Sequence, residues 1–311
     1  MVALYWIFYG TLLLGLLIGV AMTFLGLLAP FLPPLEMVNH FRPYTLFGVV
    51  VLLILAALSK AHRHAMLVVV LSFVNIWLLV DPLRSAAKAT QESSGSPLKL
   101  VTFNVWGGNS RLDAVADFLL HERADVVLLQ EMTTYHRQKL LPRLSALYPH
   151  VLTCDCQDMV LLAQRPWLDA GSQPMTERQP PTIWARFADG KGGHFRLVGL
   201  HAAFPFHPWR QARHYEWMIR ELPKIAAEPL IVAGDFNMSP WSYGLRKLAA
   251  SVGLVRHGTW ARSWPARRTW HTPFVLLDNV LTSPGVRAVS FETGPPAGSD
   301  HLPIVATLRL P

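Results

Sequence analysis

Residues 230–240 read LIVAGDFNMSP. The first four are apolar and predict a buried strand, and Gly234 lets the backbone turn where that strand ends. The turn leaves Asp235 and Asn237 at the strand exit, where open α/β sheets place their chemistry. The Ser-Pro pair at 239–240 predicts the start of a helix, with a hydroxyl cap followed by proline at the first helical position. An ordinary Asp/Asn turn is the alternative interpretation of this segment alone.

The composition divides the chain into an apolar beginning and a mildly basic remainder. The chain has 311 residues, a net charge of +8 and 51% hydrophobic residues, which is high for a purely soluble protein. The hydrophobic excess lies in the first 83 residues, and the part from residue 97 onward keeps a net charge of +6. A basic surface suits nucleic acid, an anionic membrane or a phosphorylated substrate. The net positive charge therefore predicts a partner that carries phosphate groups, and it is compatible with all three of these partners.

The two cysteines predict no structural framework. Cys154 and Cys156 make neither a disulfide framework nor a zinc-binding set. We interpret them as incidental to function, with a strained local disulfide or a redox role as the alternative.

The first apolar run is long enough to cross a bilayer. Residues 1–35 contain no Asp, Glu, Lys or Arg, and the run 4–32 exceeds the roughly 20 residues that a spanning helix needs. A cleaved signal peptide is the competing interpretation, but the segment lacks a basic start. The runs 44–58 and 65–80 are also uncharged and predict a second and a third span, with a re-entrant or surface-lying hairpin as the alternative. Residues 1–83 are therefore expected to form a multi-pass membrane region.

Charges beside these runs predict which side of the membrane the rest of the chain occupies. Lys60 and Arg63 lie with two histidines in the link between the second and third runs. The positive-inside rule places this link in the cytoplasm. The following domain is then expected on the outer, periplasmic face of the inner membrane, although Arg84 and Lys88 count against this orientation.

The remainder of the chain alternates strand and helix patterns. A small, polar segment at 84–96 predicts a flexible linker, and residues 97–311 are expected to form one soluble domain. Helices are predicted after a Ser110 cap, over 208–227 and over about 240–252. Strands are predicted at 98–104, 124–129, 158–164, 182–187, 195–200, 230–233, 275–282, 286–291 and 303–310.

Polar side chains follow the ends of these apolar strands. They are Asn104, Glu131, His201, Asp235, Asn237 and the pair Asp300 and His301. Each one alone is compatible with a solvated strand end. Together they predict a metal site, because crowded carboxylates at Glu131, Asp235 and Asp300 need a cation or a proton to neutralise them. The ligands are oxygens, so the expected ion is Mg²⁺, with Mn²⁺ or Ca²⁺ as substitutes.

Six spaced motifs carry a family resemblance. They are LVTFNV (100–105), LQE (129–131), GLH (199–201), GDFN (234–237), DNVL (278–281) and GSDHLPI (298–304). In type and order they resemble the motifs of the endonuclease/exonuclease/phosphatase superfamily, which includes DNase I-like nucleases, abasic-site endonucleases, inositol-polyphosphate 5-phosphatases and neutral sphingomyelinases. The resemblance covers about residues 97–311. It implies a four-layered α/β sandwich of two packed, mostly antiparallel sheets flanked by helices, and metal-dependent cleavage of phosphate esters.

The resemblance also implies roles for individual residues. Glu131 matches the principal metal ligand, Asn104 matches a residue that places metal or phosphate, and Asp300 joins them in the expected metal site. A hard cation held there would polarise the phosphoryl oxygen and stabilise the leaving oxyanion. His301 matches the C-terminal histidine that contacts the phosphate or activates the attacking water. His201 resembles the second histidine of the DNase I and sphingomyelinase branches, a candidate general acid or hydrogen-bond donor to the transition state.

Three more residues complete the implied site. Asp235 would orient or deprotonate the attacking water, and Asn237 would donate hydrogen bonds to the phosphate. Asp278 would orient the imidazole of either His201 or His301, and the sequence leaves this choice open. Two family features have no match: the extra carboxylate that partners the C-terminal histidine, and the loops that grip DNA.

Two aromatic and basic stretches stand where those loops would be. Residues 204–210 read FPFHPWR, and residues 260–271 contain Arg262, Arg267 and Arg268 among tryptophans. Arginine with tryptophan can stack on nucleic-acid bases or lie at an anionic lipid interface. Ordinary packing is the alternative role for most of these tryptophans.

Three functions are compatible with these features. The leading interpretation is a membrane-anchored, Mg²⁺-dependent phosphoesterase or phosphodiesterase that acts at the bilayer on a lipid-linked phosphate. The alternative is a tethered nuclease that acts on DNA or RNA. A non-catalytic membrane scaffold is the third, and the complete set of expected catalytic side chains argues against it.

Overall fold

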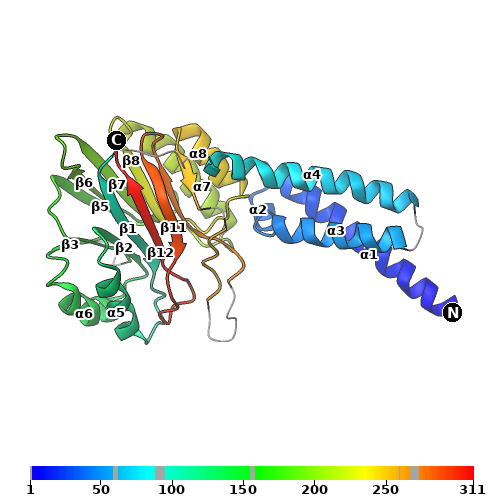
Figure 1. Cartoon of the computed structure of the whole chain (residues 1–311), viewed down its shortest axis with the longest axis horizontal. Helices are drawn as coiled ribbons and strands as arrows, with labels where there is room; N and C mark the ends of the chain where they lie inside the picture. Colours follow the sequence, from blue (N-terminus) through cyan, green and yellow to red (C-terminus); the bar gives the residue numbers. More distant parts are fainter. Residues whose placement is uncertain (1, 59–61, 88–94, 155–157, 259, 267–272) are drawn as a thin grey trace.

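The computed structural model contains two six-stranded sheets packed face to face (Figure 1). It describes residues 2–58, 62–87, 95–154, 158–258, 260–266 and 273–311. The first sheet contains, in spatial order, β11 (Arg287–Thr293), β12 (Ile304–Arg309), β1 (Pro97–Asn104), β2 (Val126–Gln130), β4 (Val160–Ala163) and β3 (His150–Thr153). The second contains β5 (Asp169–Gln173), β6 (Thr182–Ala188), β7 (His194–His201), β8 (Leu230–Asp235), β10 (Asp278–Thr282) and β9 (Val255–His257).

Each sheet has one parallel pair of strands at its centre. β1 pairs in parallel with β2, and β7 pairs in parallel with β8, whereas their other neighbours are antiparallel. Parallel neighbours bring their carboxyl ends to the same edge of a sheet. The ends of β1, β2, β7 and β8 therefore supply side chains to two facing edges.

Helices cover the outer faces of both sheets. α5 (Leu112–Glu122) and α6 (Thr134–Leu144) pack on the first sheet through a buried apolar cluster. α7 (Pro208–Glu221) and α8 (Tyr243–Val252) pack on the second sheet in the same way. A third apolar cluster lies between the two sheets. The expected four-layered α/β sandwich is confirmed.

The strands that the sequence analysis missed lie at sheet edges. β3 is the last strand of the first sheet, and β5 and β9 are the two outermost strands of the second. β3 and β5 contain no buried residue, and β9 has only three residues. Half-exposed edge strands lack the continuous apolar run that marks β2 and β8, both of which are wholly buried. The strand predicted to start at residue 275 begins at Asp278, with an isolated bridge between Val275 and Trp264 before it.

Two predicted helix starts are wrong by a few residues. The helix after the opening stretch starts at Tyr243, and Ser239 lies in the turn before it with its backbone carbonyl accepting from Ser242 N. α5 starts at Leu112 without a side-chain cap from Ser110, since Asn109 Oδ1 accepts from Arg111 N instead. At α5 the neighbouring Asn109 takes over the turn, whereas at α8 the side chain of Glu36, far away in the sequence, accepts from the N–H of Tyr243.

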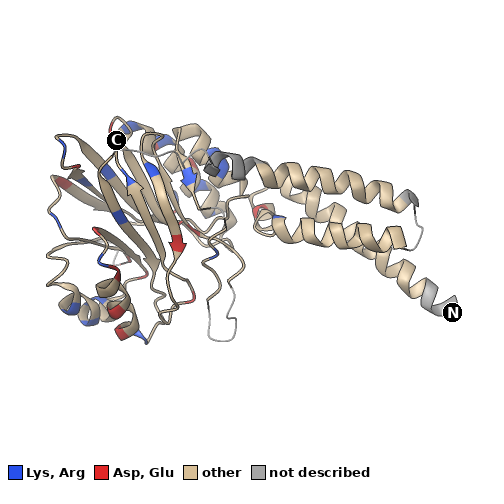
Figure 2. Cartoon of the chain, in the orientation of Figure 1, with Lys and Arg blue, Asp and Glu red and all other residues tan. Residues whose placement is uncertain are grey.

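The N-terminal region forms helices that extend from one end of the sandwich (Figure 1). They are α1 (Val2–Leu25), η1 (Gly26–Leu28), η2 (Pro33–Leu35), α2 (Glu36–Asn39), α3 (Arg42–Leu58) and α4 (His62–Ala87). Figure 2 shows almost no charged residue along the described lengths of these helices. Large apolar side chains face outward from them, including Trp6, Phe31, Phe47, Phe73 and Trp77, each at least 63% exposed. A soluble protein rarely exposes so large an apolar surface.

One helix of this region is long and apolar enough to cross a membrane by itself. It covers Trp6–Leu28, near the N-terminus, where a signal sequence passes the same test. Pro33–Asn39 and Arg42–Leu58 form a pair bent by 60° that is either a broken span or a re-entrant loop, and His64–Val80 is shorter. Part of the link with Lys60, most of the linker at 84–96, and Cys156 lie outside the described residues, so the predictions on sidedness, linker and cysteines stay predictions.

Candidate active site

The predicted site residues meet because strand register places them side by side. Asn104 at the end of β1 pairs with Gln130 at the end of β2, which is followed by Glu131. His201 at the end of β7 pairs with Asp235 at the end of β8. Asp278 at the start of the antiparallel β10 also pairs with Asp235. Residues from both sheets therefore reach one edge of the sandwich.

One amide joins the two sheets at this edge. Asn104 Nδ2 donates to Glu131 Oε1 at 2.9 Å and to Asp235 Oδ2 at 3.0 Å. Glu131 Oε2 accepts from the backbone N–H of Gly107 at 2.8 Å. The hydrogen bonds from Asn104 and Gly107 fix the orientation of the Glu131 carboxylate, which suits a ligand that must hold an ion in a set position.

Backbone conformations at the site are unusual. Glu131 and Asn237 have positive φ angles of 56° and 51°, a conformation that non-glycine residues adopt rarely. Such residues concentrate at functional sites, where the surrounding structure holds them. Gly234 has φ of 141°, and a Cβ there would lie 1.9 Å from the carbonyl oxygen of Leu200. Only glycine fits at this position, directly before Asp235.

Asp278 orients His301. Asp278 Oδ2 and His301 Nδ1 lie 2.8 Å apart, and both residues are buried. The other ring nitrogen, Nε2, lies 3.7 Å from Asp235 Oδ2. The structure therefore answers which imidazole Asp278 contacts, and it supplies the carboxylate partner of the C-terminal histidine that had no match in the sequence.

His201 has a carboxylate partner that sequence reasoning missed. Asp158 Oδ2 lies 2.8 Å from His201 Nδ1, and Asp158 Oδ1 accepts from the backbone N–H of Glu131. Asp158 precedes β4, which runs antiparallel to β2, so the start of β4 lies beside the end of β2. Asp158 neither follows an apolar strand nor belongs to one of the six family motifs, so neither signal identifies it. A search for polar residues at the starts of antiparallel strands would have included Asp158.

These pairings change the protonation of both imidazoles. Burial alone would lower the pKa of His301, but the charges of Asp278 and Asp235 outweigh it and raise that pKa to about 10. Burial likewise opposes charge on His201, and Asp158, by charge and hydrogen bond, raises the pKa of His201 to about 9. Both rings are therefore protonated at neutral pH and can donate to a phosphate oxygen.

Asp235 lies between the two imidazoles. Its Oδ2 is 3.7 Å from His201 Nε2 and 3.7 Å from His301 Nε2, and its side chain is buried. Burial raises the pKa of Asp235, an effect that the two nearby imidazoles partly offset. A carboxylate with a raised pKa accepts a proton from water more readily than a surface aspartate does.

A cavity of about 650 Å³ opens at this edge of the sandwich. Asp278 alone among the eight predicted site residues is not in its lining, and it lies behind His301. Asn237 lines the cavity but donates one Nδ2 hydrogen bond to the Ala202 carbonyl. The predicted residues in the lining are Asn104, Glu131, His201, Asp235, Asn237, Asp300 and His301, and Asp158, Phe204, His207, Arg210 and Trp264 are further lining residues.

The donor set of this cavity fits a hard divalent cation. Glu131, Asp235 and Asp300 offer carboxylate oxygens at the cavity wall, the ligands that Mg²⁺ and similar ions prefer. Among the described residues, Asp235, Asp278 and His301 also form a tight group, with one potential ligand atom of each within 4.8 Å of the others. The chemistry of the site thus accommodates a hard divalent ion.

Replacing Asp158 with Asn should move the pH dependence of activity. His201 must carry a proton to donate to phosphate, so activity should fall as pH rises through its pKa of about 9. Without the Asp158 charge that pKa is lower, and the alkaline limb of the kcat profile should shift to lower pH by at least about one unit. Asp117→Asn, at an exposed position on α5, is the control that should leave the profile in place. An unshifted limb in Asp158→Asn would show that His201 does not set it.

Fold and site together define a class of protein. A cavity lined by oxygen ligands for a cation, by two protonated imidazoles and by one buried carboxylate can bind a phosphate group and hold water against it. These are the functional groups that a hydrolase acting on phosphate esters requires.

A comparison of the sequence with models of protein families identifies the family of this chain. The model of the Endonuclease/Exonuclease/phosphatase family matches residues 101–301, and the chain belongs to this family. The match begins beyond the N-terminal helices and ends at His301. A comparison with curated proteins finds no match.

Solved structures of low sequence identity share the fold. A family protein from Bacteroides vulgatus is 21% identical with a TM-score of 0.58, over 70% of this chain and 100% of that one. A mannosyl-6-phosphatase from Bacteroides thetaiotaomicron is 13% identical with a TM-score of 0.57, over 68% and 99%. D. rerio TDP2, complexed with a single-strand DNA product, is 18% identical with a TM-score of 0.56, over 69% and 99%. These similarities concern the fold.

Proposed function

We propose that this protein is a membrane-anchored, metal-dependent hydrolase that cleaves a phosphate ester carried by a lipid. The observation that carries the proposal is the position of the cavity relative to the apolar helices. Phe204, His207 and Arg210 line the cavity, while the neighbouring Pro208 and Gln211 face Pro30 and Pro33 across a second pocket. The loop before α7 and the first turn of α7 thus lie between the catalytic cavity and the end of the candidate span Trp6–Leu28.

The chain's own residues would perform the hydrolysis. Asp235 would hold a water molecule and take its proton as the water oxygen bonds to phosphorus. The bond from phosphorus to the leaving oxygen would break, and an imidazolium at His301 or His201 would donate its proton to that oxygen. The other imidazolium would stabilise the negative charge on the phosphate oxygens. Asp278 and Asp158 would keep the two rings oriented and protonated.

The metal would be held by Glu131 with Asn104 and Asp300. These residues present oxygen atoms at the cavity wall, and the hydrogen bonds to Glu131 keep its carboxylate in place. A bound Mg²⁺, or Mn²⁺ or Ca²⁺ in its place, would supply positive charge that polarises the phosphoryl group.

Exposed aromatic side chains support a lipid substrate. Phe206 is 74% exposed and Phe204 is about half exposed in the loop before α7, and Trp209 in the first turn of α7 is also about half exposed. We call residues 204–209 the aromatic loop. The rings of Phe204 and Phe206 lie 5.1 Å apart, so the loop presents a small aromatic cluster. Phe31, 83% exposed, follows the candidate span and is the neighbour in sequence of Pro30, which shares the second pocket with Pro208. Aromatic side chains at such a position favour the headgroup level of a bilayer.

The aromatic loop gives a test of the substrate class. In full-length protein reconstituted in phospholipid vesicles, Phe206→Ser with Trp209→Ser should lower hydrolysis of a lipid phosphate about tenfold or more, because two interfacial side chains are lost. Hydrolysis of a soluble aryl phosphate by the same variant should change less than about twofold. Leu168→Ser is the control, because Leu168 is an apolar residue directly before β5 that is as exposed as Trp209. Wild-type protein that cleaves DNA briskly and ignores lipid phosphates would overturn the proposal.

Nuclease activity is the second candidate, and Arg210 and Trp264 in the cavity lining are the observations in its favour. Arg210 forms an ion pair with Glu177, as does Arg213. The pairing reduces the positive charge available to a nucleic-acid backbone, and steep salt dependence of binding would be the sign of such a backbone. The aromatic loop therefore favours lipid over nucleic acid.

For location, we propose a multi-pass arrangement in the inner membrane with the catalytic domain on the periplasmic face. Lys60 in the link between α3 and α4, and Arg63 at the second position of α4, support it through the positive-inside rule. A C-terminal alkaline phosphatase fusion should be active, because that enzyme requires the oxidising periplasm to form its disulfides. An inactive fusion at normal expression would place the domain in the cytoplasm.

A further inference from the structure

The N-terminal helices touch the catalytic domain next to its active site. Between α2 and the first turn of α3, the chain bends by 60°. We call residues 36–44 the bend. Three side chains of the bend, Glu36, His40 and Tyr44, each form a hydrogen bond to a backbone atom of the domain more than 190 residues away in the sequence. A segment that only anchored the domain to a membrane would not need such hydrogen bonds to the domain's backbone.

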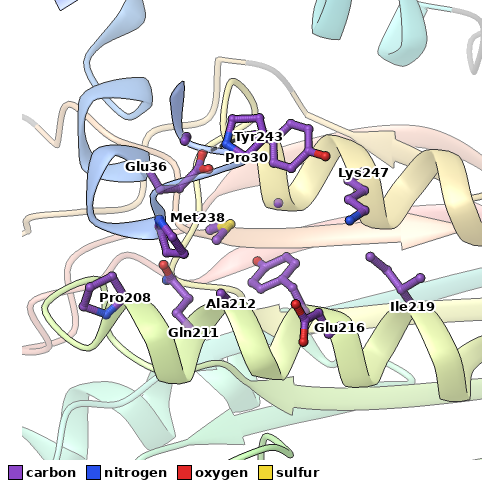
Figure 3. A pocket seen from close by; sticks show the side chains of 14 residues that line it. Pro30, Glu36, Pro208, Gln211, Ala212, Glu216, Ile219, Met238, Tyr243 and Lys247 are labelled. Carbon is purple, nitrogen blue, oxygen red and sulfur yellow. Dashed lines mark hydrogen bonds between the residues drawn. The ribbon is translucent and has the colours of Figure 1, made fainter. Parts of the chain in front are cut away.

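Glu36 completes the start of α8. Its Oε1 accepts from the backbone N–H of Tyr243 at 2.6 Å, and the side chain is buried. Ser242 occupies the N-cap position of α8 but makes no side-chain capping hydrogen bond. The first N–H groups of a helix need acceptors and favour a negative charge. Figure 3 shows Glu36 reaching from the bend toward Tyr243, above Pro208 and Gln211 of α7.

His40 holds the turn between β8 and α8. Its Nδ1 accepts from the backbone N–H of Ser239 at 3.3 Å, and both residues are buried. Ser239 is two residues after Asn237 and four after Asp235. From the other side, Asn279 Nδ2 donates to the carbonyl of Met238 at 3.0 Å. The turn that carries Asn237 is therefore held between the bend and the strand that carries Asp278.

Gln211 makes a further connection across the same turn. Its Nε2 donates to the carbonyl of Asn237 and to the carbonyl of Ala203, each at 2.9 Å. Gln211 also lines the pocket that Pro30, Pro33 and Glu36 form with α7 (Figure 3). Gln211 therefore holds two backbone groups at the edge of the catalytic cavity, on the side where Glu36 of the bend lines the same pocket.

Tyr44 holds a second active-site segment. We call residues 260–266 with 273–276 the arm. Tyr44 Oη donates to the carbonyl of Phe274 at 2.7 Å, and its ring lies edge-on to Phe274 with centroids 6.1 Å apart. Phe274 N donates to the carbonyl of Trp264, a residue that lines the catalytic cavity.

The arm in turn contacts the loop that carries His301. Ala266 N donates to the Asp300 carbonyl at 2.7 Å, and Leu302 N donates to the Ser263 carbonyl at 2.8 Å. Two hydrogen bonds thus flank His301 on both sides. A continuous chain of contacts runs from Tyr44 through the arm to the catalytic histidine.

We propose that the bend is a positioning element of the active site, with Glu36, His40 and Tyr44 as positioning residues. They fix the turn after Asp235 and the arm beside His301, and none of them lines the catalytic cavity. Displacements well below 1 Å at reacting groups lower a rate, and 1 Å can cost about a hundredfold. The proposal rests on the proposed hydrolysis at this site and deepens it, because the membrane region becomes a component of the catalytic apparatus.

Paired tyrosine variants test the proposal in the full chain. Tyr44→Phe removes only the hydroxyl that bonds Phe274, and kcat for a soluble aryl phosphate should fall about three- to tenfold with KM nearly unchanged. Tyr9→Phe is the matched control, because Tyr9 bonds His64 within the N-terminal helices. Its kcat should stay within about twofold of wild type. Equal kcat values for both variants would overturn the role of Tyr44.

His40 offers a rescue experiment. His40→Ala leaves the Ser239 N–H without its acceptor and should lower kcat about tenfold. His40→Asn restores an acceptor oxygen near the position of Nδ1 and should recover most of that loss, whereas a purely space-filling role would not distinguish Asn from other residues of its size such as Leu. Failure of Asn to exceed Leu would overturn the hydrogen-bonding role of His40.

Hydrogen exchange separates this proposal from the proposed function. Amide exchange at residues 237–242 should speed up in His40→Ala, and exchange at 273–276 should speed up in Tyr44→Phe, whatever substrate the enzyme prefers. A lipid phosphate that proves not to be the substrate would leave these results intact. Unchanged exchange at both segments, with unchanged kcat on any substrate cleaved, would overturn the positioning role.

Discussion

Asp235→Asn lowers kcat for phosphate-ester hydrolysis by about a thousandfold or more, with little change in the folded structure. The amide keeps the shape of the side chain but cannot accept a proton from water, and general base catalysis contributes about 10²- to 10⁴-fold. Asp235 also supports the positive charge of His201 and His301, both 3.7 Å from its Oδ2. Loss of its charge therefore removes the base and weakens both proton donors. Steady-state kinetics at saturating metal measures the effect.

Asp169→Asn is the control for this prediction, since Asp169 is an exposed aspartate on β5. Its kcat should stay within about twofold of wild type. An Asp235→Asn protein with more than about a tenth of wild-type kcat would mean that another group takes the proton. His201 and His301 would then have to act in their neutral forms, and their raised pKa values oppose this at neutral pH.

Glu131→Gln separates metal binding from the remaining chemistry. Removing one negative ligand should raise the Mg²⁺ concentration for half-maximal activity by about 10- to 100-fold or abolish activity altogether. Wild-type protein treated with EDTA should lose activity and regain it when Mg²⁺ returns. Titration of activity against Mg²⁺, with binding followed by calorimetry, measures both effects.

Glu292→Gln on β11 is the matched control, because Glu292 is exposed and is not one of the residues that line the cavity. It should leave the Mg²⁺ titration unchanged. A Glu131→Gln protein with wild-type Mg²⁺ dependence would show that Glu131 does not bind the ion. The buried group of Asp235, Asp278 and His301 would then be the place to look for it.

Local patterns were sufficient for the central strands. β2 and β8 are wholly buried, and their uninterrupted apolar runs mark them in the sequence. Edge strands such as β5 have no such run, because water contacts much of their surface. The predicted helix start at Ser239 failed because the first N–H group of α8 bonds Glu36, a residue 207 positions away that no local pattern identifies.

Some site residues are likewise identified by a local pattern in the sequence, and others only by the tertiary structure. Asn104, Glu131, His201 and Asp235 follow apolar strands, so a strand-end pattern identifies them. Asp158 escaped that pattern because it precedes its strand, and it approaches His201 only through the antiparallel pairing of β4 with β2.

The sequence by itself determined the family, the strand exits and the set of residues available for catalysis, because these depend on near neighbours in the chain and on spaced motifs. The tertiary structure alone decided that Asp278 serves His301, that Asp158 serves His201, and that the bend contacts the turn after Asp235. Such pairs join segments far apart in the sequence. Their partners are chosen by the packing of the two sheets and the N-terminal helices, which no local pattern records.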